Sequence, residues 1–250
     1  MNLIRISHIA MTCCLLTSVA LAQVPTETIK PGTLLSASGI QLTNFGKPLP
    51  LPPGNWEVLY RADTALALTG GGRDSAPVVS LTLRNTDGAA TLAAMVLVYT
   101  PDVIQIHWKG NTACKEGKAP FMEDFGTTTG SLNYACAMAF VNEKGFKSLV
   151  STASTHPNAW VKEFLAPLAS HQADLPDRVI WSTLNANRDR SRSLYLTFFS
   201  RPAVTSTTGE PLDGATRNWL TATGKAYIDF LEGQASVVQP YPRLEAAVTQ

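Results

Sequence analysis

Residues 114–140 read CKEGKAPFMEDFGTTTGSLNYACAMAF, and the rest of the chain can be placed around them. Cys114 and Cys136 enclose a segment rich in glycine and threonine, a composition typical of a loop. From residue 132 to Phe140, large side chains alternate with alanines, which predicts a strand with one small-residue face. Because successive side chains of a strand point to opposite faces, the alanine face would let a helix pack closely.

The two cysteines predict a disulfide bond. Cys13 and Cys14 lie within the first 22 residues, so Cys114 and Cys136 are left as an even pair in the remaining chain. In an exported protein such a pair is typical of a structural disulfide. Closing this loop would stabilise the fold by about 3.4 kcal/mol through chain entropy. A metal or redox role is the alternative, but a redox pair favours C-x-x-C spacing or a nearby activating charge.

Residues 1–22 have the pattern of a signal peptide. One basic residue precedes an apolar run, and Ala20-x-Ala22 before Gln23 is a small-x-small cleavage pattern. We expect cleavage between Ala22 and Gln23, and a periplasmic or secreted mature protein. Lipid attachment at Cys13 or Cys14 is an alternative, although neither follows the usual small residues. No later stretch has the length expected of a membrane-spanning helix.

The composition narrows the classes of function. Removing the first 22 of the 250 residues leaves 228, and Arg5 is the only charged residue lost. The mature chain then has 19 basic and 19 acidic residues, so its formal net charge is zero. Neither nucleic acid nor an anionic membrane surface is favoured as a partner. A chain of this length can bury one core, and we expect a single domain.

Several stretches predict antiparallel strands. Val78–Arg84 and Thr91–Thr100 read as a hairpin, and the second of these is apolar on both faces, as in a central strand. Val179–Leu184 and Ser193–Ser200 predict a second hairpin. Alternating apolar side chains that begin at Trp56 predict a half-buried strand.

Two stretches predict helices that pack on this sheet. The first is expected to begin with Pro157 at its first helical position and to end or kink at Pro167. The second is expected to begin at Pro211 or Asp213 and to run to Leu231, with apolar residues at helical spacing.

These elements predict an α+β fold, a mainly antiparallel β-sheet with two packed helices. Residues 23–48 are expected to form an extended N-terminal segment, residues 49–233 a single domain, and residues 234–250 a loosely held tail. Phe146–Ser151 is expected to be a short strand. Gly224 is expected to weaken the middle of the second helix.

The stretch LPPGNWEV at residues 51–58, the hairpin after it and the later cysteine pair resemble a group of exported proteobacterial proteins of unknown function. Proteins of that group often open with an LPPGxW-like stretch, and the similarity covers about residues 47–142. The resemblance implies no activity and no functional residue. In physical terms the motif needs only a rigid turn that leads into a strand, with Trp56 anchored in the core.

His107 is the candidate catalytic residue, because it lies in a predicted strand near the disulfide loop. Together with Glu123 or Asp124 it would make the protein a small periplasmic hydrolase. A neutral strand histidine without a catalytic role is the alternative. The mature histidines show no H-x-x-x-H or H-E-x-x-H spacing, and we predict no metal and no cofactor.

Arg188, Arg190 and Arg192 cluster at the tip of the second hairpin and are candidate contacts for an anion, as His107 is for a ligand. Asp189 lies among them and favours a solvated tip instead. Each of the five tryptophans falls on an apolar stripe, which predicts core packing: Trp56, Trp108, Trp160, Trp181 and Trp219.

The favoured function is a non-catalytic binding or envelope-accessory module of the periplasm. Its partner would be another protein or an envelope component, with no nucleic acid and no membrane span. Export, one disulfide, a neutral charge and the lack of a catalytic motif motivate this hypothesis. The hydrolase is the alternative from a different class, and a secreted factor that acts on other cells is a third possibility.

Overall fold

The computed structural model describes residues 24–42, 46–67, 75–88, 90–100, 119, 121–126, 134–142, 144–188, 192–202, 212 and 214–242. Its main sheet consists of β2 (Leu34–Leu35), β5 (Trp56–Ala67), β6 (Ser75–Asn85), β7 (Leu92–Tyr99), β8 (Phe121–Asp124), β9 (Tyr134–Asn142), β10 (Val179–Arg188) and β11 (Arg192–Ser200). These eight strands are antiparallel, in the order β2-β5-β6-β7-β11-β10-β9-β8. The predicted fold class, α+β with a mainly antiparallel sheet, is confirmed.

Both predicted hairpins are confirmed. Strands β6 and β7 pair with Leu83 opposite Met95, and β7 also pairs with β11 on its other side. Strand β7 is therefore central, and nearly all of its side chains are buried on both faces. The β10–β11 hairpin is longer than predicted, because its pairing continues to Arg188 opposite Arg192.

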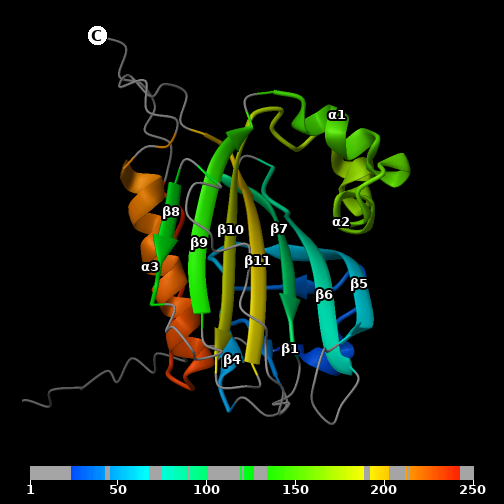
Figure 1. Cartoon of the computed structure of the whole chain (residues 1–250). Coiled ribbons are helices and arrows are strands. Elements are labelled where there is room, and N and C mark those ends of the chain that lie inside the picture. Colours follow the sequence, from blue (N-terminus) through cyan, green and yellow to red (C-terminus); the bar gives the residue numbers. More distant parts are fainter. Residues whose placement is uncertain are drawn as a thin grey trace, which may run out of the picture.

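The helices are α1 (Phe146–Ser151), α2 (Ala159–Phe164) and α3 (Gly214–Leu231), with the 3-10 turns η1 (Thr26–Thr28), η2 (Ala153–Thr155) and η3 (Ala166–His171). Figure 1 shows α3 along one side of the sheet beside β8 and β9, while α1 and α2 gather at the opposite upper corner. Helix α3 is the predicted second helix. It ends as predicted, since Gly233 has φ 82° and the Gln234 N–H donates to the Asp229 carbonyl at 2.8 Å.

Helix α2 begins two residues later than predicted, at Ala159 instead of Pro157. Asn158 caps it, because the Asn158 side chain accepts hydrogen bonds from the N–H groups of Trp160 (2.9 Å) and Val161 (3.4 Å). Pro157 therefore lies before the cap. The expected break at Pro167 is confirmed, since the α-helix stops at Phe164 and a 3-10 turn follows.

The prediction that Phe146–Ser151 is a strand was wrong, because this segment is helix α1. The cause lies 32 positions along the chain at Asp177, whose carboxylate accepts hydrogen bonds from the N–H groups of Gly145 and Lys147, both at 3.2 Å. The Asp177 carbonyl also accepts from the Phe146 N–H at 3.0 Å. A helix start capped by a distant residue leaves no local sequence signal.

The sheet is covered on both faces. Helix α3 packs on one face, where Ala135, Ala137 and Ala139 of β9 are buried as predicted for the alanine face. Phe198 of β11 contacts Trp219 of α3 edge to face, with ring centroids 5.3 Å apart. Helices α1 and α2 cover part of the other face with a second, smaller apolar cluster.

The N-terminal segment belongs to the core. It adds a small sheet of β1 (Val24–Pro25), β3 (Ile40–Gln41) and β4 (Pro48–Leu49), and it buries Ile29 and Leu35 in the same cluster as α3. Arg61 of β5 fixes the segment, because its Nη1 donates to the carbonyls of Thr26 (2.6 Å) and Ile29 (2.7 Å).

The expectation of a loosely held tail was wrong for residues 234–242. Val238 is buried in the main core, and the Trp219 indole N–H donates to the Gln239 carbonyl at 2.9 Å. The Tyr241 ring packs against the Trp219 ring with centroids 4.6 Å apart. We call residues 234–242 the C-terminal strap. Residues 243–250 lie outside the described residues.

Candidate functional site

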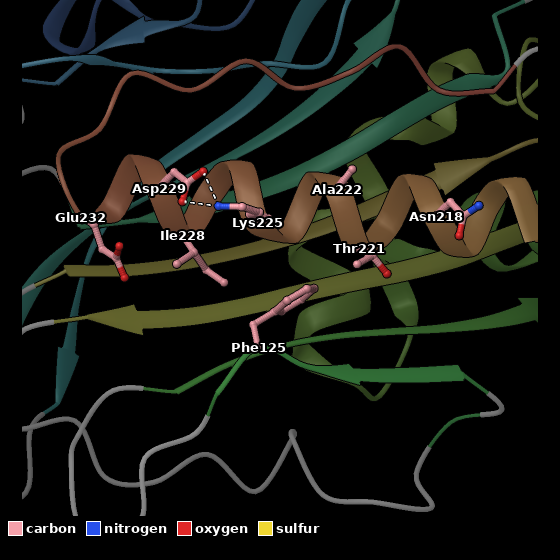
Figure 2. A pocket seen from close by; sticks show the side chains of 8 residues that line it. All are labelled: Phe125, Asn218, Thr221, Ala222, Lys225, Ile228, Asp229 and Glu232. Carbon is pink, nitrogen blue, oxygen red and sulfur yellow. Dashed lines mark hydrogen bonds and ion pairs between the residues drawn. The ribbon is translucent and has the colours of Figure 1, made fainter.

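A groove of about 560 Å³ lies between the end of β8 and the outward face of α3, shown in Figure 2. Its size is within the range of small-molecule pockets, ~300–1,000 Å³. Positions three or four apart on α3 share one face of the helix, which explains why this face supplies almost the whole lining. The lining residues are Phe125, Asn218, Thr221, Ala222, Lys225, Ile228, Asp229 and Glu232.

Phe125 forms the apolar floor at the middle of the groove. Its backbone is fixed, because the Phe125 N–H donates to the Ala135 carbonyl of β9 at 2.9 Å. Its ring packs directly on the backbone of Gly224, where a Cβ would overlap the ring atoms Cζ and Cε2. Figure 2 shows the ring pointing up towards α3, between Ile228 and Thr221. This close approach requires glycine at residue 224.

The two ends of the groove differ in chemistry. At one end the Lys225 ammonium donates to both carboxylate oxygens of Asp229, at 3.0 and 3.1 Å. Glu232 lies beyond this ion pair, at the carboxyl end of α3, where the helix dipole adds a negative partial charge. Asn218 and Thr221 at the other end are polar and uncharged. The groove therefore has an apolar middle, one uncharged polar end, and one end at which acidic side chains outnumber basic ones.

The two acidic candidates of the predicted hydrolase point to opposite faces of β8. Glu123 lies opposite Ala137, on the α3 face, whereas Asp124 lies opposite Cys136 on the other face. The Asp124 carboxylate accepts a hydrogen bond from the Gly126 N–H at 2.9 Å, which is typical of a turn. His107 lies outside the described residues, so its pairing with either carboxylate stays a prediction.

Other predicted sites are described only in part. The backbone pairing of Arg188 with Arg192 places both at the predicted hairpin tip, while Arg190 lies outside the described residues. Cys136 is fully buried on β9. Its predicted partner Cys114 lies outside the described ranges, as do the cleavage residues Ala22 and Gln23 and the tryptophan Trp108.

Two further properties concern metals and membranes. Within the described ranges, no three His, Cys, Asp or Glu side chains lie close enough together to hold a metal ion. None of the helices in those ranges is both long and apolar enough to cross a membrane.

Periodicity did not indicate the groove, because its helical wall is an exposed, mostly polar face. Ala222 and Asn218 are exposed and read as solvent-facing positions of an amphipathic helix. Two local signals were present, however: a glycine in the middle of a long helix and a phenylalanine at a loop start. Neither signal predicts a groove by itself, because the groove forms only when these two residues, about one hundred positions apart, are in contact.

Comparisons with known proteins give no relative for this chain: no family model matches it, and neither the curated proteins nor the solved structures contain a match. The resemblance of residues 51–58 to the exported proteobacterial group therefore stays a prediction.

Proposed function

We propose that this protein is an exported binding module that holds an amphipathic peptide segment of a partner protein in the groove beside α3. The observation that carries the proposal is the Phe125 ring, held on Gly224 as a fixed apolar floor between two polar ends. A floor that is fixed before binding lowers the entropy lost on binding.

The length of the groove favours a short extended peptide. From Asn218 to Glu232 the α3 stripe spans 14 helical steps, about 21 Å. An extended chain of about six residues covers that distance. Alternate side chains of such a peptide would meet the Phe125 ring and Ile228, while the others face solvent.

The charges of the groove favour one direction of the peptide. Its described lining carries one basic side chain, Lys225, and two acidic ones, Asp229 and Glu232. Lys225 is already paired with Asp229, and the carboxyl end of α3 adds negative partial charge. The carboxyl end of α3 would therefore favour a Lys or Arg of the partner, and the apolar residues of the peptide would lie at Phe125.

The compartment and the disulfide are parts of the same proposal. The signal-like residues 1–22 support export to the periplasm or beyond. A disulfide between Cys114 and Cys136 is supported by the full burial of Cys136 on β9. Mass spectrometry of the unreduced secreted protein would report both the mature N-terminus and the loss of two hydrogens.

The proposed function is tested by site-specific photo-crosslinking in cells. A benzophenone amino acid at Thr221 should give a discrete adduct with a partner, and the same group at exposed Ser148 of α1 should not. The crosslinked partner segment is then synthesised and titrated against the purified protein by calorimetry. This second step measures the affinity of the partner segment for the groove.

Two matched variants of α3 decide the outcome. Ala222→Trp fills the groove and should weaken peptide binding at least about tenfold, a loss of about 1.4 kcal/mol. Ala215→Trp makes the same change at an exposed position of the same helix outside the groove, and binding should be unchanged. Equal effects of the two variants, or equal adducts at Thr221 and Ser148, would contradict the proposal.

A further inference from the structure

A second cavity, of about 550 Å³, opens where three segments meet. These segments are the LPPG turn before β5, the turn between β6 and β7, and the C-terminal strap. The lining residues are Pro53, Gly54, Asn55, Asn85, Asp87, Ala90, Thr91, Leu92, Pro240 and Tyr241. We call it the strap cleft. It shares no lining residue with the groove beside α3.

The first two walls of the strap cleft are locked together. Gly54 has φ 141°, and a Cβ at this position would lie 2.7 Å from Asn85 Nδ2, so only glycine allows this approach. The Asn55 carbonyl accepts a hydrogen bond from the Thr86 N–H at 2.9 Å. Asn85 is only 7% exposed, and its Oδ1 atom accepts from the Asp87 N–H at 3.0 Å. The glycine of the LPPG turn thus shapes this cleft.

The strap supplies the third wall, and Tyr241 fixes it in place. The Tyr241 hydroxyl forms hydrogen bonds with Ser200 Oγ at 2.9 Å and with Thr216 Oγ1 at 3.1 Å. The Tyr241 ring also packs on the Trp219 ring, and the Trp219 indole N–H donates to the Gln239 carbonyl. A flat aromatic wall held from both ends is therefore present before any ligand binds.

The lining is rich in hydrogen-bonding groups and carries one acidic side chain, Asp87. Amides of Asn55 and Asn85, the hydroxyl of Thr91 and the carboxylate of Asp87 offer both donors and acceptors. Among the described residues of the lining none is Lys, Arg or His, which disfavours an anionic ligand. Leu92, the prolines and the tyrosine ring supply flat apolar walls.

We propose that the strap cleft binds a neutral sugar. A sugar ring presents hydroxyl groups along its edge, which pair with amide, carboxylate and hydroxyl side chains. It presents C–H groups on its faces, which pack on proline and aromatic surfaces. The proposed site is independent of the peptide groove.

The test is a titration of the purified mature protein with two neutral trisaccharides, maltotriose and tri-N-acetylchitotriose. Binding is followed by tryptophan fluorescence, because Trp219 touches Tyr241, and by saturation-transfer NMR, which reports sugar protons near the protein. At least one sugar should bind saturably, with a dissociation constant of about 1 mM or lower.

Two asparagine variants separate the two sites. Asn55→Trp, at an exposed position, fills the strap cleft and should weaken sugar binding at least tenfold. Asn218→Trp fills the α3 groove instead and should leave sugar binding unchanged. Circular dichroism checks that each variant folds, and Thr91→Phe is a second variant that blocks the cleft.

Two results would overturn the sugar proposal. One is a lack of saturable binding of both sugars; binding of the cation spermidine in its place, lost in Asp87→Asn, would then assign the cleft to a cation. The other is an equal effect of Asn55→Trp and Asn218→Trp on sugar binding. None of these results bears on the peptide groove, whose variants are tested with a different ligand.

Discussion

The ring of Phe125 occupies the space that a side chain at residue 224 would need. A Cβ on Gly224 would overlap Cζ and Cε2 of that ring and would lie 3.1 Å from Cε1. Glycine in a helix interior costs about 1 kcal/mol relative to alanine. Gly224 is therefore a condition for the floor of the groove as well as a weak position of α3.

Gly224→Ala should have opposite effects in two backgrounds. With Phe125 present, the new methyl group displaces the ring, and we expect a net destabilisation of about 1 kcal/mol. In Phe125→Ala the space is empty, so the same change should stabilise by up to about 1 kcal/mol through helix propensity. Urea unfolding of all four variants measures this coupling. The same effect in both backgrounds would show that the ring does not depend on residue 224.

Two buried tyrosines should make the protein lose stability in alkali. Burial raises the pKa of Tyr99 to about 12 and raises the pKa of Tyr227 further above its ordinary value near 10. Between pH 10 and pH 12 the tyrosines of the unfolded chain have lost phenolic protons that the folded chain keeps. The free energy of unfolding is therefore intact below pH 10 and falls as the pH rises towards 12.

The size of this alkaline effect can be measured. Each fully shifted tyrosine contributes a slope of about 1.4 kcal/mol per pH unit above pH 10. Tyr227→Phe should remove one such slope, and because it also removes the hydrogen bond to the Pro50 carbonyl it should cost about 1 kcal/mol at neutral pH. Urea unfolding at pH 8 to 11.5 checks both parts. An unchanged slope in Tyr227→Phe would contradict the assignment.

The hydroxyl and the ring of Tyr241 should each contribute to the stability of the strap. Tyr241→Phe keeps the contact with Trp219 but loses the hydrogen bonds to Ser200 and Thr216, and we expect a loss of about 1–2 kcal/mol. Tyr241→Ala should cost about 3–4 kcal/mol and shift the tryptophan emission to the red, because Trp219 becomes wetter. If the two variants unfold at the same urea concentration, the ring contact contributes nothing.

The proposed disulfide should contribute strongly to stability. Its reduction, or the double change of Cys114 and Cys136 to serine, should lower the free energy of unfolding by about 3 kcal/mol. The direct measurement is thiol counting with a maleimide in denaturant, with and without reductant. Two thiols that appear only after reduction are expected in the mature protein, and thiols that react without reductant would exclude the bond.

The parts of the fold that could be predicted from the sequence are those with local periodicity. Alternation specified the two hairpins, and helical spacing together with Gly233 specified α3 and its end. Helix α1 was missed because its cap is Asp177, 32 positions away. The strap was missed because Pro240–Pro242 carries no periodic pattern, and only the contact of Tyr241 with Trp219 gives it a fixed place.

Of the candidate site, only its structural frame could be predicted. The alanine face of β9 indicated close packing of a helix, and α3 packs there. The groove itself depends on the exposed face of α3, whose polar residues read as solvated. Phe125 contacts Gly224, and Gly54 contacts Asn85, although the members of each pair are distant in the sequence. Such contacts cannot be predicted from a single sequence.

Val238 and Ile29 are buried in one apolar cluster, although 209 positions of sequence separate them. The apolar cluster cannot be complete until Val238 and the strap have been synthesised, because they follow α3 in the chain. Domains generally fold from the N-terminus as they are synthesised. Here a nascent or truncated polypeptide that stops at Gly233 would lack the strap and would expose Trp219 to chaperones and proteases.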